Sequence, residues 1–195
     1  MVRKLARRAA RLGQWCIVDE TFAEYCEQVS IMPEDLPPRT IVLRSFTKFY
    51  GLPGLRVGYV VASPKVIQQI GAQQPPWSVN MLAQRAAQMA LHDRRHSQRS
   101  IRFMERERAR FLKGLEQIPG CSMFPSVANF LLGELPARLK AARLVPMLRR
   151  QGLLIRDCSQ VPGLNDRSIR VAVRSRADND RLLGALADIL RDMRA

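Results

Sequence analysis

The segment from Ser45 to Tyr59 combines residue types that could hold an aldehyde and a phosphate. Lys48 follows Ser45-Phe46-Thr47 directly, a glycine-rich turn comes next, and Arg56 stands eight residues past the lysine. A lysine amine can form a Schiff base with an aldehyde and then act as leaving group and proton carrier. A hydroxyl and a guanidinium can hold a phosphate. A lone lysine near glycines is usually a solvated loop residue, so the case for chemistry depends on a second element.

That second element is an acidic strand end about thirty residues upstream of the lysine. The run Ile17-Val18-Asp19-Glu20 is typical of a buried strand that finishes on carboxylates. Taken alone, Asp19 would more often be a strand-end or helix-cap carboxylate. With Lys48 following it, a carboxylate that pairs with a ring nitrogen becomes the better interpretation, because that pairing keeps the nitrogen protonated and electron-accepting.

The elements that must position these residues alternate between strand and helix patterns. We expect Lys48 on the turn that leaves a strand, where ligands of open α/β sheets gather. The expected strands cover residues 15–19, 40–45, 57–62, 124–132, 153–158 and 168–173. The expected helices cover residues 1–12, a short stretch from Ser63-Pro64, the segment from the turn 74–80 to about 90, and residues 97–118, 137–151 and 175–193. Gly13 caps the first of these helices and Ser175 with Asp178 begins the last.

Bulk composition excludes several classes of protein. The chain has 195 residues, 47% of them hydrophobic, and no apolar run near the roughly 18 residues that span a bilayer. The formal charge of +15 could indicate a nucleic-acid binder, but 27 of the 32 basic residues are arginine and they are spread along the chain without a recognised binding motif. The basic surface favours anionic substrates or an acidic partner. We expect a cytoplasmic protein with reduced cysteines.

A metal site is not expected. The four cysteines show no paired spacing, and the two histidines, His92 and His96, lie four residues apart on one expected helix. No carboxylate or cysteine pattern completes a zinc site with them. A solvated helix face is the preferred interpretation of both.

From Trp15 to the C-terminus, the sequence resembles the class I and II enzymes that depend on pyridoxal 5'-phosphate (PLP), the fold-type-I aminotransferase superfamily. Within it, the chain looks like the threonine-phosphate decarboxylases, close relatives of the histidinol-phosphate aminotransferases. The motifs are the strand ending at Asp19, the block 45–59, the turn Pro76-Trp77-Ser78-Val79-Asn80, Val127-Ala128-Asn129-Phe130, Gly152-Leu153-Leu154-Ile155-Arg156-Asp157-Cys158, Pro162-Gly163-Leu164 and Ile169-Arg170-Val171-Ala172-Val173-Arg174-Ser175.

The resemblance implies both a fold and a cofactor site. Residues 1–90 would be the C-terminal part of a three-layer α/β/α PLP-binding large domain, and residues 91–195 a small α+β C-terminal domain. Lys48 and Asp19 would be catalytic, Lys48 as the Schiff-base lysine and Asp19 on the pyridine nitrogen. Ser45 and Arg56 would hold the cofactor phosphate.

The resemblance also implies a substrate site and a reaction. Arg156 and Arg170 would face the carboxylate and phosphate of a phosphorylated amino acid. Asn129 would position substrate or simply cap a strand, and Arg174 would be solvated or salt-bridged. The implied reaction is decarboxylation of L-threonine O-3-phosphate to aminopropanol phosphate, a step of cobalamin biosynthesis, by an enzyme that is a homodimer at full length. A histidinol-phosphate aminotransferase and a non-catalytic fragment are the alternatives.

The sequence departs from the superfamily pattern in two places. A tyrosine often stands three residues after the aspartate and donates to the cofactor's phenolic oxygen; here that position is Phe22, which resembles the decarboxylase branch. The second departure is the missing first half: the N-terminal arm, a glycine-containing phosphate loop, a ring-stacking aromatic, an asparagine and about four strands of the sheet.

The chain therefore looks like a C-terminal half. A fragment, a product of an internal start and half of a split gene are the alternatives. Because hydrophobic strands would lack neighbours on an open edge, we expect the isolated chain to bind PLP weakly and to be close to inactive.

Overall fold

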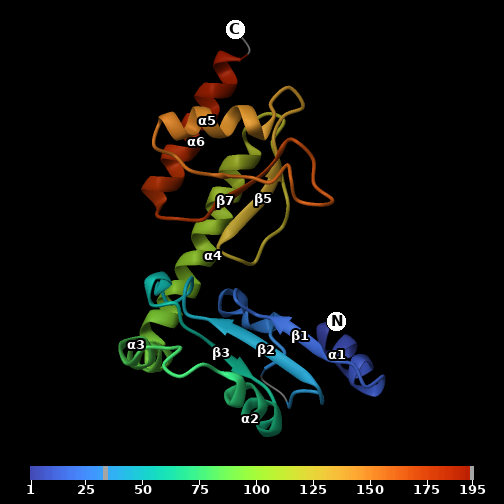
Figure 1. Cartoon of the computed structure of the whole chain (residues 1–195). Helices are drawn as coiled ribbons and strands as arrows, with labels where there is room; N and C mark the ends of the chain where they lie inside the picture. The colour runs from blue at the N-terminus through green and yellow to red at the C-terminus, as the bar shows by residue number, and fades with distance from the viewer. Residues whose placement is uncertain (33–34, 194–195) are drawn as a thin grey trace. The chain divides into compact units, whose positions relative to one another are not determined.

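The computed structural model describes residues 1–32 and 35–193 and divides into two compact units (Figure 1). The units are Met1–Ile101 and Arg102–Ala195, and each is described by itself. The sequence placed a domain boundary after residue 90, and the identity of the units with the two expected domains remains a prediction. Among the described residues, no helix is long and apolar enough to cross a bilayer.

The first unit is built on a three-stranded sheet in the order β1-β2-β3. The strands are β1 Cys16–Asp19, β2 Thr40–Ser45 and β3 Gly58–Val61. β1 pairs with β2 in parallel, and β3 pairs with β2 antiparallel. A parallel pair needs a long crossover, and here residues 20–39 provide it, including two short 3-10 helices, Ala23–Tyr25 and Glu27–Val29.

Four α-helices belong wholly or partly to this unit. They are α1 Val2–Arg11, α2 Pro64–Gln73, α3 Met81–His92 and the start of α4 Arg94–Glu116. The expected N-terminal helix is confirmed, with Gly13 at φ +68 just beyond it, a backbone conformation that glycine adopts at little cost. The Asn80 side chain accepts a hydrogen bond of 2.8 Å from Ala83 N and so begins α3.

Apolar burial fixes the loop after β2 against α3. Phe46 and Val57, at the two ends of this loop, form a buried cluster with Ala83 and Ala87 of α3. Tyr50 and Tyr59 pack against the same cluster, and their ring centroids lie 5.1 Å and 5.4 Å from that of Phe46. Each fully buried large side chain contributes about 1.5–3 kcal/mol, so the path of this loop is set by its aromatic residues.

The second unit is a four-stranded antiparallel sheet with helices α5 Ala141–Arg150 and α6 Arg176–Asp192 and the part of α4 from Arg102 onward. The strands, in sheet order, are β4 Ser122–Met123, β5 Phe130–Glu134, β7 Ser168–Ala172 and β6 Arg156–Asp157. Side chains from the central strands and both helices are fully buried: Leu131, Val171, Leu144, Leu148 and Leu186. As expected, Ser175 caps α6, accepting from Asp178 N at 3.2 Å.

Three element boundaries in this unit were predicted wrongly. The strand expected from residue 124 begins only at Phe130, because Ser126 folds the preceding segment: its hydroxyl donates to Phe130 O at 2.7 Å and accepts from Ala128 N at 3.2 Å. The helix expected from residue 137 begins at Ala141, after a turn in which Leu139 N donates to Pro136 O. The strand expected over 153–158 shortens to the two residues of β6.

Candidate cofactor site

Lys48 lies exposed on the turn that follows β2, between two buried aromatic side chains. Phe46 and Phe49 are only 2% and 5% exposed, so the residues on either side are anchored while the lysine faces outward. Backbone bonds close the turn: Gly51 N donates to Lys48 O at 3.2 Å, and Leu52 N donates to Phe46 O at 3.1 Å. The sequence placed Lys48 on such a turn, and the structure agrees.

Asp19 ends β1 at the same edge of the sheet, because β1 and β2 run parallel. Thr21 donates two hydrogen bonds to Asp19 Oδ1, one from its hydroxyl and one from its backbone N–H at 2.9 Å. These two bonds lower the pKa of Asp19; burial opposes them, and the nearby Lys48 charge adds a smaller lowering effect. Asp19 is therefore ionised, and Oδ2 can accept a further hydrogen bond.

The aromatic ring of Phe22 lies beneath the lysine. Lys48 Nζ is 5.4 Å from the ring centroid, a distance typical of a cation–π contact. Phe22 stands where the superfamily often has a tyrosine. The face of its ring stabilises the Lys48 ammonium group by a cation–π contact. The contribution of Thr21 was missed by the sequence analysis, although Asp-x-Thr is a spacing at which a threonine commonly bonds to an aspartate.

The two predicted phosphate ligands lie on opposite sides of the lysine turn in sequence. Ser45 ends β2, and its hydroxyl is 2.8 Å from Thr47 Oγ1 and accepts from Thr47 N at 3.2 Å. Arg56 is exposed, donates to Pro53 O at 3.1 Å and has φ +51, a left-handed conformation that is uncommon for a residue with a side chain. Thr47 adds a second hydroxyl that the prediction did not include.

In the second unit, Arg156 and Arg170 lie directly opposite each other. They are register partners on the antiparallel strands β6 and β7, so both guanidinium groups leave the sheet on the same, exposed face. Arg170 also stacks on Phe130, with its guanidinium carbon 5.0 Å from the ring centroid. Like charges directly across a strand pair are unfavourable unless an anion is placed between them.

Asn129 and Arg174, the two other residues considered for the substrate site, lie on either side of the β5–β7 pair in sequence. Asn129 lies just before β5, and its carbonyl accepts from Val173 N at 2.9 Å; its role toward substrate remains a prediction. Arg174 forms an ion pair with Asp178, Nε to Oδ2 at 3.1 Å, which confirms that it is salt-bridged.

The prediction that His92 and His96 share a solvated helix face is wrong. The helix breaks at Asp93, which accepts from His96 N at 2.8 Å through Oδ1, so His92 ends α3 and His96 belongs to α4. His96 is half-buried, and its Nε2 lies 3.0 Å from the carbonyl oxygen of Phe49. Within residues 1–32 and 35–193, no group of three or more His, Cys, Asp or Glu side chains could hold a metal ion.

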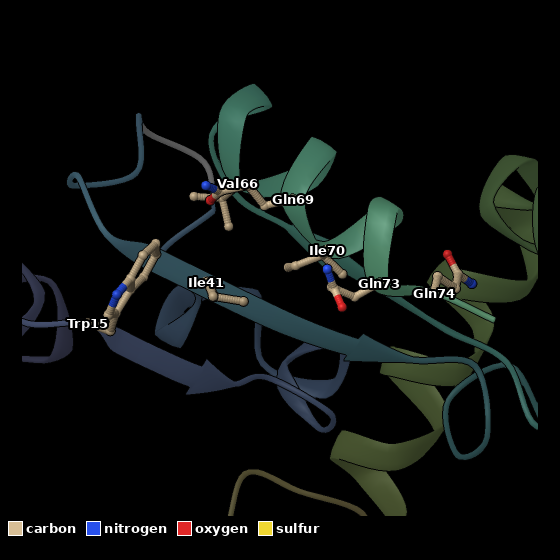
Figure 2. A pocket seen from close by; sticks show the side chains of 7 residues that line it. All are labelled: Trp15, Ile41, Val66, Gln69, Ile70, Gln73 and Gln74. Carbon is tan, nitrogen blue, oxygen red and sulfur yellow. The ribbon is translucent and has the colours of Figure 1, made fainter.

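A separate apolar cavity of about 510 Å³ opens between the sheet and α2. Figure 2 shows Trp15 and Ile41 on the strand side and Val66 and Ile70 on the helix, with three glutamines beside them. None of the predicted cofactor residues lines this cavity. It indicates instead that α2 covers this face of the sheet incompletely.

Comparisons with known proteins agree with the geometry. Residues 1–186 match the family model described as aminotransferase class I and II. The threonine-phosphate decarboxylase of Salmonella typhimurium is 39% identical over 193 residues, which are 97% of this chain and 52% of that protein. The histidinol-phosphate aminotransferase of Methanocaldococcus jannaschii is 34% identical over 176 residues, which are 89% of this chain and 47% of that protein.

Solved structures show the same relationship. The histidinol-phosphate aminotransferase of Clostridium acetobutylicum superposes with a TM-score of 0.90 at 28% identity, covering 97% of this chain and 58% of that one. The enzyme of the same name from Sinorhizobium meliloti, solved in complex with pyridoxal 5'-phosphate, superposes with a TM-score of 0.77 at 25% identity, covering 96% and 53%. The chain thus spans about half the length of the relatives it matches, and the expected α/β fold is confirmed. It belongs to the class I and II aminotransferase family.

Proposed function

We propose that this chain supplies the lysine-bearing part of a PLP-dependent enzyme that decarboxylates L-threonine O-3-phosphate to aminopropanol phosphate, as in cobalamin biosynthesis. The observation that carries the proposal is the placement of the Lys48 amine and the Asp19 carboxylate at one edge of two parallel, paired strands. The family membership and the 39% identity to a threonine-phosphate decarboxylase support it. Because the chain spans about half the length of that relative, the activity belongs to the longer enzyme.

The residues around Lys48 fit PLP in their chemistry. Lys48 offers an exposed amine to the cofactor aldehyde, and Asp19 offers an ionised carboxylate to the pyridine nitrogen. Ser45 and Arg56 offer a hydroxyl and a guanidinium to the phosphate. When bound, PLP supplies an electron sink for the bond that breaks at the substrate α-carbon.

The chain's own residues then have separate tasks. Asp19 would hold the pyridine nitrogen in its protonated form, because hydrogen bonds from Thr21 and the Lys48 charge favour the ionised carboxylate. Lys48 would hold the cofactor aldehyde, and its amine is the group that could carry a proton to and from the substrate α-carbon. Phe49 and Phe46, buried on either side, keep the amine facing outward throughout.

The paired arginines of the second unit suit a substrate with two anionic groups. Arg156 and Arg170 stand opposite each other, and each can form a bidentate pair with a carboxylate or a phosphate. Binding energy at these groups can orient the reacting bond at the α-carbon. Their assignment to substrate, together with that of Asn129, is part of the proposal.

The second candidate is an aminotransferase acting on histidinol phosphate, which the 34% identity and the highest of the quoted TM-scores favour. The two reactions would differ in which bond of the substrate α-carbon breaks: the bond to the carboxylate in the decarboxylase, or the bond to hydrogen in the aminotransferase. Phe22 in place of a tyrosine resembles the decarboxylases, and so does Arg174-Ser175 after β7, where the aminotransferases more often have Gly-Thr.

Product analysis separates the candidates. The chain is assayed with PLP, alone and together with a separately expressed N-terminal half of the Salmonella typhimurium relative. The proposal predicts carbon dioxide and aminopropanol phosphate from L-threonine O-3-phosphate in the combined sample. Amino transfer from histidinol phosphate, with no carbon dioxide release, would support the second candidate instead. Binding of nucleic acid that weakens steeply with salt, with no cofactor binding in either sample, would indicate a non-catalytic fragment.

A further inference from the structure

The carbonyl of Phe49, the residue after the proposed cofactor lysine, is held by a side chain from a distant helix. The neighbouring carbonyls of Phe46 and Lys48 accept backbone N–H groups of Leu52 and Gly51 within the turn. The Phe49 carbonyl instead lies 3.0 Å from Nε2 of His96, a residue 47 positions later in α4. A carbonyl oxygen only accepts hydrogen bonds, so Nε2 must carry the proton.

The His96 ring is also packed against the lysine turn. It lies edge-on to Phe49, with ring centroids 5.8 Å apart, and parallel to Tyr50 at 6.3 Å with an interplanar angle of 23°. Phe49 also meets Tyr25, which lies in the crossover after β1, edge-on with ring centroids 5.2 Å apart. Phe49 therefore packs against both the crossover after β1 and the first turn of α4.

The position of the imidazole is itself fixed by the start of its helix. Asp93 Oδ1 accepts from His96 N at 2.8 Å, which caps α4 and sets the direction of the first turn. Ser100 Oγ, one turn later, lies 3.3 Å from the same Nε2. The His96 side chain is thus held by Asp93 at the start of α4 and by Ser100 one turn further along the helix.

We propose that His96 is a positioning residue for Lys48: its Nε2–H holds the Phe49 carbonyl, and this bond keeps the lysine amine aimed at the ligand edge of the sheet. The proposal deepens the cofactor function given above and rests on it for the identity of the ligand. The bond itself is a property of this chain that can be measured without cofactor.

Three variants separate the hydrogen bond from the ring packing. His96→Phe keeps an aromatic ring and removes the donor. His96→Gln removes the ring and keeps an N–H donor of similar reach. His92→Phe is the matched control, because His92 is exposed at the end of α3 and contacts Gln88 O of its own helix.

The first measurement is amide hydrogen exchange of residues 46–52, with β2 as the internal reference. Loss of one net hydrogen bond predicts exchange about fivefold faster in His96→Phe, with wild-type rates in His96→Gln and His92→Phe. Unchanged exchange in His96→Phe, or equally fast exchange in both His96 variants, would overturn the proposal. If β2 also exchanges faster in His96→Phe, that variant has lost structure beyond the turn. The result then depends on His96→Gln, in which residues 46–52 must still exchange at the wild-type rate.

The second measurement is borohydride trapping of PLP on Lys48, followed by mass spectrometry. The proposal predicts slower trapping in His96→Phe and recovery in His96→Gln. Slower trapping in both, or in neither, would contradict it. Absence of a Lys48 adduct in the wild type would instead count against the cofactor function, while the exchange measurement still decides whether His96 holds the turn.

Discussion

Two buried carboxylates share one arginine behind the candidate site. Arg44, in β2, lies 2.7 Å from Glu20 and 3.1 Å from Glu24, and all three side chains are less than 10% exposed. Removing one partner of a buried pair leaves an uncompensated charge. We expect Arg44→Met to lower the free energy of unfolding by about 3–5 kcal/mol, measured by urea denaturation. Arg85→Met, on the exposed side of α3, is the control and should change it little.

The same cluster should make the free energy of unfolding depend on pH. Burial raises the pKa of Glu24 above its ordinary value of 4.5, against the weaker opposing effect of Arg44. Its contribution to stability is therefore full below the ordinary value and is lost as pH rises through the folded-state pKa. Glu24→Gln removes this titration, so its stability relative to wild type should improve as pH is raised from about 4 to 7. A constant difference across this range would contradict the assignment.

Most single residues of the site followed from sequence motifs, but their supports did not. Lys48, Asp19 and Ser45 could be proposed from the sequence because their residue types and spacing form local motifs. Thr21 was missed although it is two residues from Asp19, since its role depends on a turn geometry. His96 was misassigned because its partner is 47 residues away and no short-range pattern links them.

Secondary-structure elements were predicted best where caps and periodicity agree. β2 was placed at its observed ends, Thr40 and Ser45, and α6 begins after the expected capping serine. The segment 124–129 was taken for strand from its apolar residues. The Ser126 turn and the donation from Arg108 to the carbonyls of Val127 and Ala128 overrode that pattern.

The close contact between strands β2 and β3 can be tested by adding a single methyl group at Gly58. A Cβ at Gly58, the first residue of β3, would lie 2.6 Å from the backbone carbonyl oxygen of Arg44 in β2. Gly58→Ala should therefore push the strands apart and cost about 1–3 kcal/mol of stability. Gly71→Ala is the matched control: no atom lies within 4 Å of a Cβ there, and alanine in helix α2 should be neutral or stabilising. Equal effects of the two changes on the melting temperature would refute the close approach.

At the scale of the molecule, the sheet of the first unit is small and has an edge strand on each side. β1 and β3 are both edge strands in the three-stranded sheet. Paired residues of neighbouring strands share a face, and on one face Ile17, 64% exposed, lies beside Ile41, with Trp15 and Ile70 around the cavity of Figure 2. Open edges with an apolar face favour association with other strands.

We therefore expect the isolated chain to self-associate and to bind PLP weakly. Analytical ultracentrifugation with equilibrium dialysis of PLP tests this expectation. Addition of the N-terminal half of a relative should reduce the self-association and increase cofactor affinity together, because both depend on the same uncovered sheet. A well-folded monomer with micromolar PLP affinity on its own would refute it.

The central claim is that Lys48 is the cofactor lysine among the five lysines of the chain. The most direct measurement treats wild type, Lys48→Ala and Lys65→Ala with PLP and borohydride and maps the adducts by mass spectrometry. Lys65 is the control because it is an exposed lysine at the start of α2. We predict preferential labelling of Lys48 that is lost only in Lys48→Ala. Labelling spread over the lysines in proportion to their exposure would contradict it.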